Sequence, residues 1–234
     1  MKVAIVGLQK KQFITKLKTE YPDFVIDTEH PEMVICYGGD GTLLFGEREY
    51  PGIPKILVRN SKVCFLCVGG GDISILQSVL DDEYTVKEYM KIEAVAHNQH
   101  MTALSEVVIG HKRINTALRF TATWRDIETT EIIGDGCIVS TPIGSTGYFN
   151  SITRTSFEQG IGVAFNNPII ENPHHILDES TEIEITITRG PGLLAVDNSE
   201  SFIELTTGDI VRIRPSSEKA YIIEPKNAEF PKNK

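Results

Sequence analysis

The chain has 234 residues, 41% hydrophobic and 24% charged, which fits one large domain or two small ones with a packed core and excludes wholesale disorder. Its formal net charge of −9 argues against non-specific binding to nucleic acid or to an anionic membrane, although a nucleotide ligand needs only local donors. No apolar stretch approaches the roughly 20 residues of a membrane span. The N-terminal segment 1–7 is too short and strand-like for a signal peptide, so we expect a cytoplasmic protein.

The first third of the chain alternates strand-like and helix-like patterns. We expect strands at 3–6, 24–26, 33–37 and 56–58, and helices at 9–20 and 73–80. Strands that alternate with helices favour a parallel α/β sheet with ligands at the C-terminal ends of its strands.

From about residue 91, short strands separated by turn residues replace this pattern. They are expected at 102–109, 118–124, 137–140, 183–187, 193–196 and 210–213, and segment 220–223 could return to the first domain. The sequence therefore predicts an α/β N-terminal domain with a parallel sheet, formed by 1–90 with the tail 215–234. It also predicts an all-β, sandwich-like C-terminal domain over 91–214.

A glycine-flanked acid follows the expected strand 33–37, in the run Gly38-Gly39-Asp40-Gly41-Thr42. An apolar run that stops at a glycine cluster indicates a buried strand ending in a tight loop, and Thr42 is expected to begin the next helix. Because glycines let backbone N–H groups approach a phosphate, Gly38, Gly39, Gly41 and Thr42 are candidate phosphate contacts.

A carboxylate in such a loop is repelled by phosphate unless it has a chemical role. We therefore interpret Asp40 as a general base, or as the group that orients a hydroxyl about to be phosphorylated. A turn-forming Asp is the alternative. One of the basic residues nearby could bind a donor phosphate, although solvated charges are the plainer interpretation; these are Arg48, Lys55, Arg59 and Lys62.

A second unusual stretch covers 134–148, where the expected strand 137–140 runs into Thr141-Pro142-Ile143-Gly144-Ser145-Thr146-Gly147-Tyr148. Hydroxyls and free N–H groups at a loop or helix start suit a phosphate or a base edge, and Tyr148 offers a stacking face. The alternative is a capped turn between two elements.

The four cysteines are Cys36, Cys64, Cys67 and Cys137. Cys64 and Cys67 form a C-x-x-C, but no second ligand pair has zinc-site spacing, and the apolar neighbours look like strand interior. We therefore expect buried, reduced thiols and no protein metal site.

Together, the Asp40 loop and the Asp135–Tyr148 stretch resemble the two signature motifs of the NAD kinase family, which phosphorylates the adenosine 2′-hydroxyl of NAD to give NADP. Asn60 and the run Val63-Cys64-Phe65-Leu66 resemble a further family segment, with Cys64 in place of Gly. The resemblance spans 33 to about 213. It implies ATP with Mg²⁺ as donor, or polyphosphate, and NAD or NADH as acceptor. It also implies a homodimer or homotetramer, because a neighbouring subunit completes the nicotinamide end in this family.

The resemblance also assigns roles to single positions. Asp135 corresponds to the carboxylate that holds the nicotinamide-side ribose. Thr146 and Tyr148 correspond to the adenine-contacting pair, and Ser151 is placed to reach a phosphate or ribose oxygen. Phe65 lies either against the adenine or in the core.

At other motif positions this chain has a different residue from the family, or matches the family only in its position along the motif. The family's Asn-Glu corresponds to Ser105-Glu106, so Ser105 would hold the adenine-side nucleoside differently. Ser145 and Gly147 belong to the second motif, and the family prefers Ala at Gly147. Asp197 resembles a late family Asp, although Asn198 replaces the Gly that follows it.

Two alternatives remain open at this level. Lipid kinases of the diacylglycerol type and phosphofructokinases share a Gly-Gly-Asp-Gly loop, but the Thr-Pro-x-Gly-Ser-Thr stretch before a Tyr is not expected in lipid kinases. The departures at Ser105 and Asn198 motivate a non-catalytic dinucleotide-binding or sensing protein as the second alternative.

Overall fold

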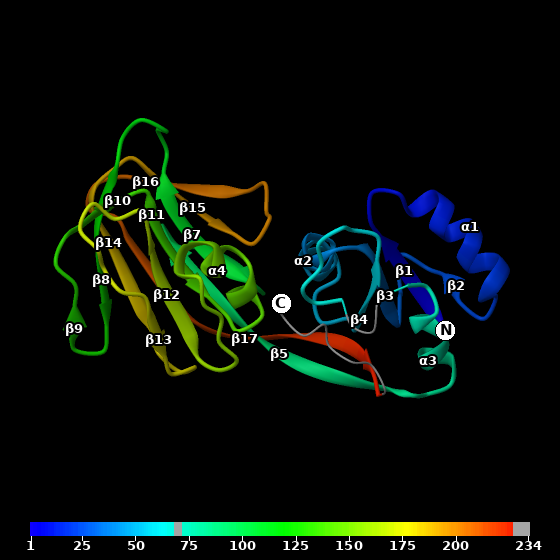
Figure 1. Ribbon diagram of the computed structural model, residues 1–234. Coiled ribbons are helices and arrows are strands. Elements are labelled where there is room, and N and C mark those ends of the chain that lie inside the picture. The colour runs from blue at the N-terminus through cyan, green and yellow to red at the C-terminus, as the bar shows by residue number, and fades with distance from the viewer. Residues whose placement is uncertain (68–71, 227–234) are drawn as a thin grey trace. The chain divides into compact units, whose positions relative to one another are not determined.

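The computed structural model describes residues 1–67 and 72–226 (Figure 1). The chain divides into two compact units, one formed by Met1–Tyr89 and Lys219–Lys234, the other by Met90–Glu218. Part of the predicted C-terminal tail, 227–234, lies outside the described residues. Among the described helices, none combines the length and apolar character needed to cross a membrane.

The first unit is built on a parallel sheet, as predicted. Its strands run in the order β17-β4-β3-β1-β2, and every neighbouring pair is parallel. The bounds are β1 Lys2–Val6, β2 Val25–Ile26, β3 Met33–Gly38, β4 Lys55–Arg59 and β17 Ile210–Pro225, which joins β4 through Ile222.

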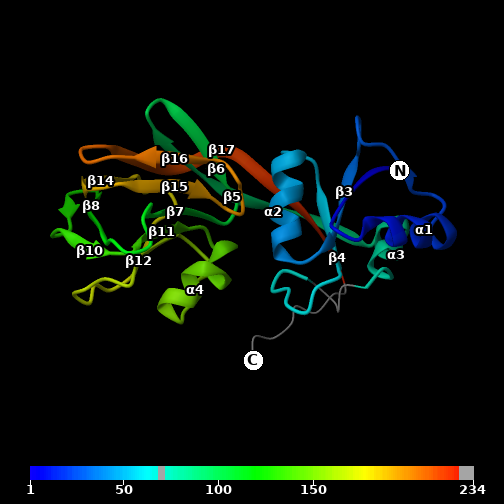
Figure 2. The same cartoon turned by 90° about the horizontal axis from the view of Figure 1, so that it is seen from above.

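Helices cover both faces of this sheet, which explains why its central strands are near-continuous apolar runs. Helices α1 (Lys10–Glu20) and α3 (Ile75–Leu80) share one hydrophobic core with alternate residues of β1, β3 and β4. Helix α2 (Asp40–Glu49) covers the other face, where a Cβ on Gly46 would lie 2.7 Å from Cys36 Sγ. Figure 2 shows α2 on one side of these strands and α1 with α3 on the other.

The second unit holds two antiparallel layers. One contains β10-β8-β14-β17, with β9 on β8 and the β5-β6 hairpin on β17; the other is a six-stranded sheet in the order β13-β12-β11-β7-β15-β16. The bounds in the first layer are β5 Tyr84–Ala96, β6 Gln99–Ala103, β8 Leu118–Trp124, β9 Ile127–Glu128, β10 Ile132–Gly134 and β14 Ile183–Arg189. In the second they are β7 Glu106–His111, β11 Gly136–Ser140, β12 Ile161–Asn166, β13 His175–Leu177, β15 Gly192–Val196 and β16 Phe202–Leu205.

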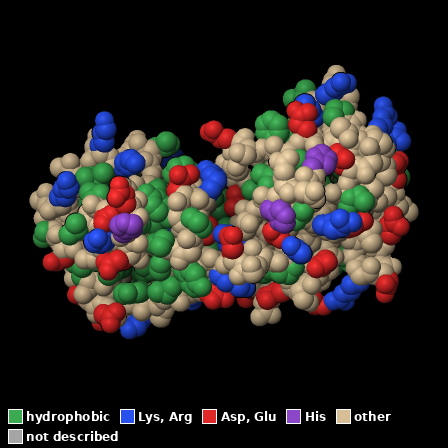
Figure 3. Space-filling view, turned by 180° about the vertical axis from the view of Figure 1, so that it is seen from behind, with side chains coloured by type: hydrophobic (Ala, Val, Ile, Leu, Met, Phe, Trp, Pro, Cys, Tyr) green, Lys and Arg blue, Asp and Glu red, His purple; other side chains and the backbone are tan. Residues whose placement is uncertain are grey.

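Inward-facing residues of both layers form one core, as in a sandwich. The outer face of the six-stranded sheet carries the 3-10 turn η1 (Gly144–Thr146) and the helix α4 (Tyr148–Thr153). Phe149 of α4 packs with Phe157 and Ala164. In the space-filling view, acidic and basic side chains are interspersed over the visible face of the molecule (Figure 3).

Several element expectations differ from the structure. The expected segments 210–213 and 220–223 are parts of one 16-residue strand, β17. Strand β5 was not expected, because most of its first half is exposed and shows no alternation. The expected strand 102–109 is two strands, β6 and β7, since the N–H groups of Leu104 and Ser105 bond a side-chain carboxylate instead of a neighbouring strand.

Candidate active site

The turn between β3 and α2 places Asp40 at the first residue of the helix, with Gly39 as its N-cap. The expected helix start at Thr42 is therefore wrong, because the N–H of Thr42 already bonds the Gly39 carbonyl at 2.8 Å. A Cβ on Gly38 would lie 2.0 Å from Oγ1 of Thr42, so a larger residue there would displace the Thr42 side chain. A carboxylate in the first turn also interacts favourably with the helix dipole.

Two backbone amides hold the Asp40 carboxylate. The N–H of Phe65 donates to Oδ2 and the N–H of Leu66 donates to Oδ1, both at 2.9 Å. Each oxygen keeps further acceptor capacity, and the side chain is half-buried. The carboxylate is therefore fixed in direction while it remains able to accept a proton or a hydroxyl hydrogen bond.

The cysteines beside Asp40 correct one expectation. Cys64 and Cys67 form a disulfide, whereas Cys36 and Cys137 are free and buried, as expected. Sγ of Cys64 lies 3.2 Å from Oδ1 of Asp40. A disulfide sulfur carries no hydrogen, so this contact is not a hydrogen bond. The sequence reasoning failed because local apolar neighbours do not show whether two sulfurs meet.

The remaining residues predicted near this loop lie in distinct settings. Gly41 is exposed, Thr42 is half-buried, and Phe65 is 48% exposed, which excludes the core interpretation of that ring. Lys55 is fully buried and pairs with Glu47, so it is neither solvated nor available to a phosphate.

The guanidinium of Arg59 also serves the local structure. It donates to the backbone carbonyls of Ser61 at 3.0 Å and Lys62 at 2.8 Å. These bonds brace the segment that follows β4.

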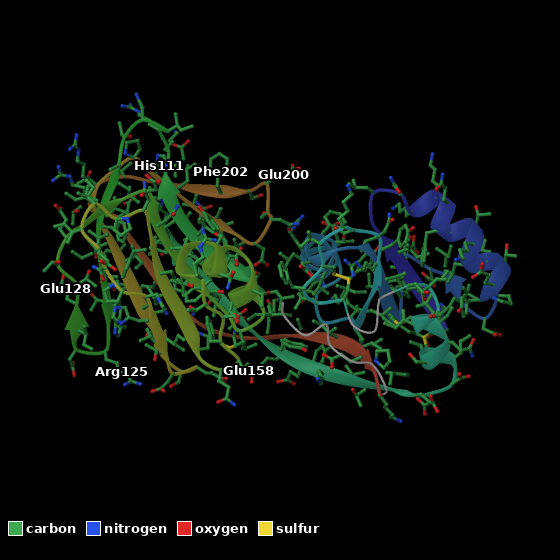
Figure 4. The ribbon with its side chains drawn as sticks, in the orientation of Figure 1. His111, Arg125, Glu128, Glu158, Glu200 and Phe202 are labelled. Atoms are coloured by element: carbon green, nitrogen blue, oxygen red, sulfur yellow. A yellow bond between two sulfur atoms is a disulfide. The ribbon has the colours of Figure 1, made fainter. Side chains whose placement is uncertain are left out.

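In the second unit, Asp135 sits in a turn that glycine makes possible. Gly136 has φ +147°, and a Cβ there would lie 1.9 Å from the Ile109 carbonyl. Oδ2 of Asp135 accepts a hydrogen bond from Nδ2 of Asn167 at 3.3 Å, and Oδ1 lies 4.0 Å from Nε2 of His111. Figure 4 labels His111 at the end of β7.

A cavity of about 170 Å³ opens beside Asp135 in this unit. Its lining combines hydrogen-bonding side chains with an apolar strand surface, and consists of Val108, Ile109, Gly110, His111, Asp135, Cys137, Ile138, Tyr148 and Asn166. The Tyr148 hydroxyl accepts a hydrogen bond from Nδ2 of Asn166 at 3.0 Å. The structure thus brings two predicted residues, Asp135 and Tyr148, to one cavity wall.

The hydroxyl-rich turn before α4 mainly stabilises the local structure through close packing and internal hydrogen bonds. A Cβ on Gly144 would lie 2.2 Å from the Ser105 carbonyl oxygen, so the turn lies directly against that strand junction. Ser145 is buried, and its hydroxyl bonds the carbonyls of Pro142 at 2.7 Å and Phe157 at 3.0 Å. The Ser145 hydroxyl is thus used inside the protein, and its predicted contact with a ligand stays a prediction.

The other predicted residues of this turn lie at its surface. Tyr148 is 40% exposed, Gly147 is exposed, and Thr146 is half-buried. Ser151 is exposed and its hydroxyl donates to the Tyr148 carbonyl at 2.7 Å. Their positions suit contact with a ligand that approaches the start of α4.

Asp197 organises the neighbouring junction. Its carboxylate accepts three backbone N–H bonds, from Leu104 at 2.9 Å, Ser105 at 2.8 Å and Glu106 at 3.0 Å. Asp197 lies at a positive φ of 48°, which aims the side chain back toward β7. This role explains why a carboxylate is needed there even though Asn198 follows it.

Glu106 is the titratable group most perturbed at this site. Burial raises the pKa of its carboxyl to about 7, with a smaller rise from the Asp197 charge, while the Ser105 hydroxyl, which donates at 2.9 Å, opposes the shift. Burial likewise raises the pKa of Asp197, against the three amides that lower it. Ser105 therefore orients Glu106.

Sequence reasoning missed three residues of this cavity region: His111, Asn166 and Asn167. Asn167 has a positive φ of 48°, a conformation in which Asn is enriched. An Asn pair that ends an apolar strand and precedes Pro168 is a turn signal that could have drawn attention to it. The pairing of β11 with both β7 and β12 then brings these residues to Asp135.

Comparisons with known proteins agree with this architecture. Residues 104–225 match the model of the ATP-NAD kinase C-terminal domain. An NAD kinase of Methanospirillum hungatei is 29% identical over 213 residues, covering 88% of this chain and 79% of the relative. An NAD kinase of Picrophilus torridus is 30% identical over 213 residues, covering 86% of this chain and 77% of the relative.

Two crystal structures share the fold. An NAD kinase from Archaeoglobus fulgidus in complex with ATP superposes with a TM-score of 0.79 at 17% identity, covering 97% of this chain and 94% of that one. Yeast NADH kinase complexed with NADH superposes with a TM-score of 0.81 at 17% identity, covering 97% of this chain and 84% of that one. Because the family model matches over half of the chain and a relative reaches 30% identity, this protein is an enzyme of the NAD kinase family.

Proposed function

We propose that the enzyme transfers a phosphoryl group from ATP to the adenosine 2′-hydroxyl of NAD, giving NADP, with Asp40 as the group that accepts or orients the hydroxyl proton. The observation that carries this proposal is the fixed Asp40 carboxylate, held by two amides at the start of α2. Phosphoryl transfer depends mainly on alignment and charge stabilisation, which such a fixed group serves. The ATP-bound and NADH-bound relatives support the two substrates.

We assign the dinucleotide contacts to the second unit and the donor phosphates to the first. Asp135 and Tyr148 share one cavity wall, and Ser105, Glu106, Thr146, Gly147 and Ser151 lie on the neighbouring turn and junction. Gly38, Gly39, Gly41 and Thr42 form the turn around Asp40, which suits an anion near a helix start. Each unit is thus proposed as a domain with its own ligand surface.

Mg²⁺ fits this chemistry as a companion of ATP. Among the described residues, no group of three or more His, Cys, Asp or Glu side chains could hold a metal alone. Mg²⁺ is commonly held by one or two carboxylates together with substrate phosphates, so a single acid such as Asp40 suffices on the protein side. When bound, the ion neutralises phosphate charge.

The test is a coupled assay with ATP, Mg²⁺ and NAD, in which an NADP-specific dehydrogenase detects the product. Asp40→Asn keeps the size of the side chain but removes its basicity, so we expect kcat to fall by about 10²-fold or more while NAD still binds. Asp23→Asn, an exposed change in the same unit, is the matched control. Full activity of Asp40→Asn would remove Asp40 from the mechanism.

The same assay separates the finer alternatives. Exchanging ATP for polyphosphate identifies the donor, and exchanging NAD for NADH identifies the acceptor. NAD binding without any NADP would favour the sensing function. We also propose a homodimer or homotetramer, to be measured by light scattering; Phe202 on the six-stranded sheet is 55% exposed and offers apolar surface for such contact. The cytoplasmic location stays a prediction.

A further inference from the structure

We propose that Cys64 and Cys67 form a thiol-redox site that sets the position of the Asp40 carboxylate, so that the disulfide form is the more active one. This inference rests on the proposed function of Asp40. The family pattern that this chain resembles has Gly where Cys64 stands. The pair is therefore a property of this chain that the phosphoryl-transfer chemistry does not require.

The disulfide closes a short loop that contains the two amides bonded to Asp40. The residues enclosed between the bridged cysteines are Phe65 and Leu66, and their N–H groups are the ones that hold Asp40 at 2.9 Å. A covalent closure of this short loop restricts the conformations of both amides. The disulfide thus fixes the donors that fix the carboxylate.

Reduction changes the contacts of Asp40 in two ways. It opens the ring that constrains the Phe65 and Leu66 amides. It also gives Cys64 an S–H, and its sulfur lies 3.2 Å from Oδ1 of Asp40 in the oxidised form. A thiol there can donate to Oδ1 and take up part of the acceptor capacity of the Asp40 carboxylate, whereas the disulfide sulfur donates nothing. Both changes oppose the role of Asp40 as proton acceptor.

The reaction is ordinary thiol–disulfide exchange with a dithiol reductant. One reductant thiolate attacks a sulfur of the bridge, the S–S bond breaks, and a mixed disulfide forms. The second reductant thiolate then resolves it. The protein gains two electrons and two protons as the thiols of Cys64 and Cys67, and the reductant leaves as its cyclic disulfide.

The burial of the sulfurs sets the conditions of the experiment. Cys64 is 7% exposed and Cys67 is 2% exposed, so a small dithiol reaches them more slowly than a surface bridge. Between them, Phe65 is 48% exposed, which leaves the loop itself open to solvent. Long incubation with dithiothreitol, or with its oxidised form, prepares the two states. Thiol titration under denaturing conditions verifies them, with two free thiols expected when oxidised and four when reduced.

The experiment measures kcat, KM and amide hydrogen exchange on the full chain in both states. We expect kcat to fall by roughly tenfold on reduction, less than the ~10²-fold loss that a 1 Å displacement of a reacting group can cause. KM for NAD should change less than kcat, because most of the proposed NAD contacts lie in the second unit and only Phe65, a candidate adenine contact, lies in the bridged loop. Exchange at the amides of Phe65 and Leu66 should accelerate by about fivefold or more. Re-oxidation should restore kcat and the exchange rates of the two amides.

Two variants complete the design. Cys67→Ala should have the kcat and the amide exchange of the reduced wild type, and the redox treatment should change neither. Cys36→Ala, which removes a buried free thiol that is not part of the bridge, should keep the full response. Failure of Cys67→Ala to fold would not affect the wild-type comparison.

Equal kcat and equal amide exchange in the two verified states would overturn the proposal. A bridge that only stabilises the fold would shift the thermal midpoint and leave kcat unchanged, which also overturns it. A different outcome tests the proposed function instead: redox-dependent exchange with no NADP in either state leaves the loop mechanism standing and removes the kinase assignment of Asp40.

Discussion

The two units hold their buried or half-buried acids in different ways. Asp40, in the first unit, is half-buried and depends on two amides of one short loop. In the second unit, Asp197 accepts three amides at a strand junction, against which the Gly144 turn is tightly packed. The first arrangement leaves a half-buried acid with further acceptor capacity, as the proposed role of Asp40 requires, whereas the second stabilises the framework. Changes in the first should therefore alter kcat, and changes in the second should alter stability.

The largest expected effect on stability is at Gly144. In Gly144→Ala the new Cβ would lie 2.2 Å from the Ser105 carbonyl oxygen, so backbone must move. We expect a loss of about 3 kcal/mol or more in the free energy of unfolding, at the upper end for overpacking. Urea denaturation measures it. A stability equal to wild type would show that the turn and the junction are not rigidly packed.

Asp197→Ala should have the next largest effect. It leaves the N–H groups of Leu104, Ser105 and Glu106 without their acceptor. We expect a loss of about 2–3 kcal/mol, because partial hydration offsets some of the cost of unmet donors. Asp126→Ala, an exposed change in the same unit, is the control and should stay within about 0.5 kcal/mol of wild type. Equal losses in the two variants would refute the anchoring role.

Glu106 makes stability depend on pH. Its folded pKa is about 7 against an ordinary value of 4.5, so between these values the native state binds more protons than the unfolded chain. The stabilisation is therefore complete below about pH 4.5 and is lost as the pH rises through about 7. At about 1.4 kcal/mol for each pH unit between these two values, we expect it to be on the order of 3 kcal/mol.

The measurement is the free energy of unfolding from pH 4.5 to 8 for the wild type and for Glu106→Gln. The variant carries no titrating group at position 106, so its free energy of unfolding should lack the loss that Glu106 causes as the pH rises. The raised pKa of Asp197 acts in the same direction and remains in both proteins. Parallel profiles would contradict the burial of the Glu106 carboxyl.

The smallest effect is expected at Gly147, in the same motif as Gly144. A Cβ on Gly147 would lie 3.3 Å from the Gly144 carbonyl oxygen and 3.6 Å from Oε2 of Glu106, so the neighbours need to move by only a few tenths of an ångström. We expect Gly147→Ala to stay within about 1 kcal/mol of wild type by urea denaturation. A loss as large as that of Gly144→Ala would erase the distinction between the two glycines.

Much of the chemistry could be predicted because it depends on local residue order. A Cβ on Gly38 would meet the Thr42 side chain, and Gly136 adopts a positive φ, so both acids, Asp40 and Asp135, have glycine neighbours that the structure uses. Ser145 shows the limit of such local information, and its predicted ligand contact stays a prediction. A hydroxyl in a loop looks the same in sequence whether it faces a ligand or the Phe157 carbonyl.

The sequence by itself determined the parallel α/β unit, the β-rich unit and the Asp40 loop, because hydrophobic periodicity and glycine positions act over a few residues. Only the tertiary structure decided that Cys64 meets Cys67, that their loop holds Asp40, and that Asp197 anchors the junction 104–106. Strand pairing and loop closure bring these groups together. Their contacts depend on distances in space, which residue order along the chain does not specify.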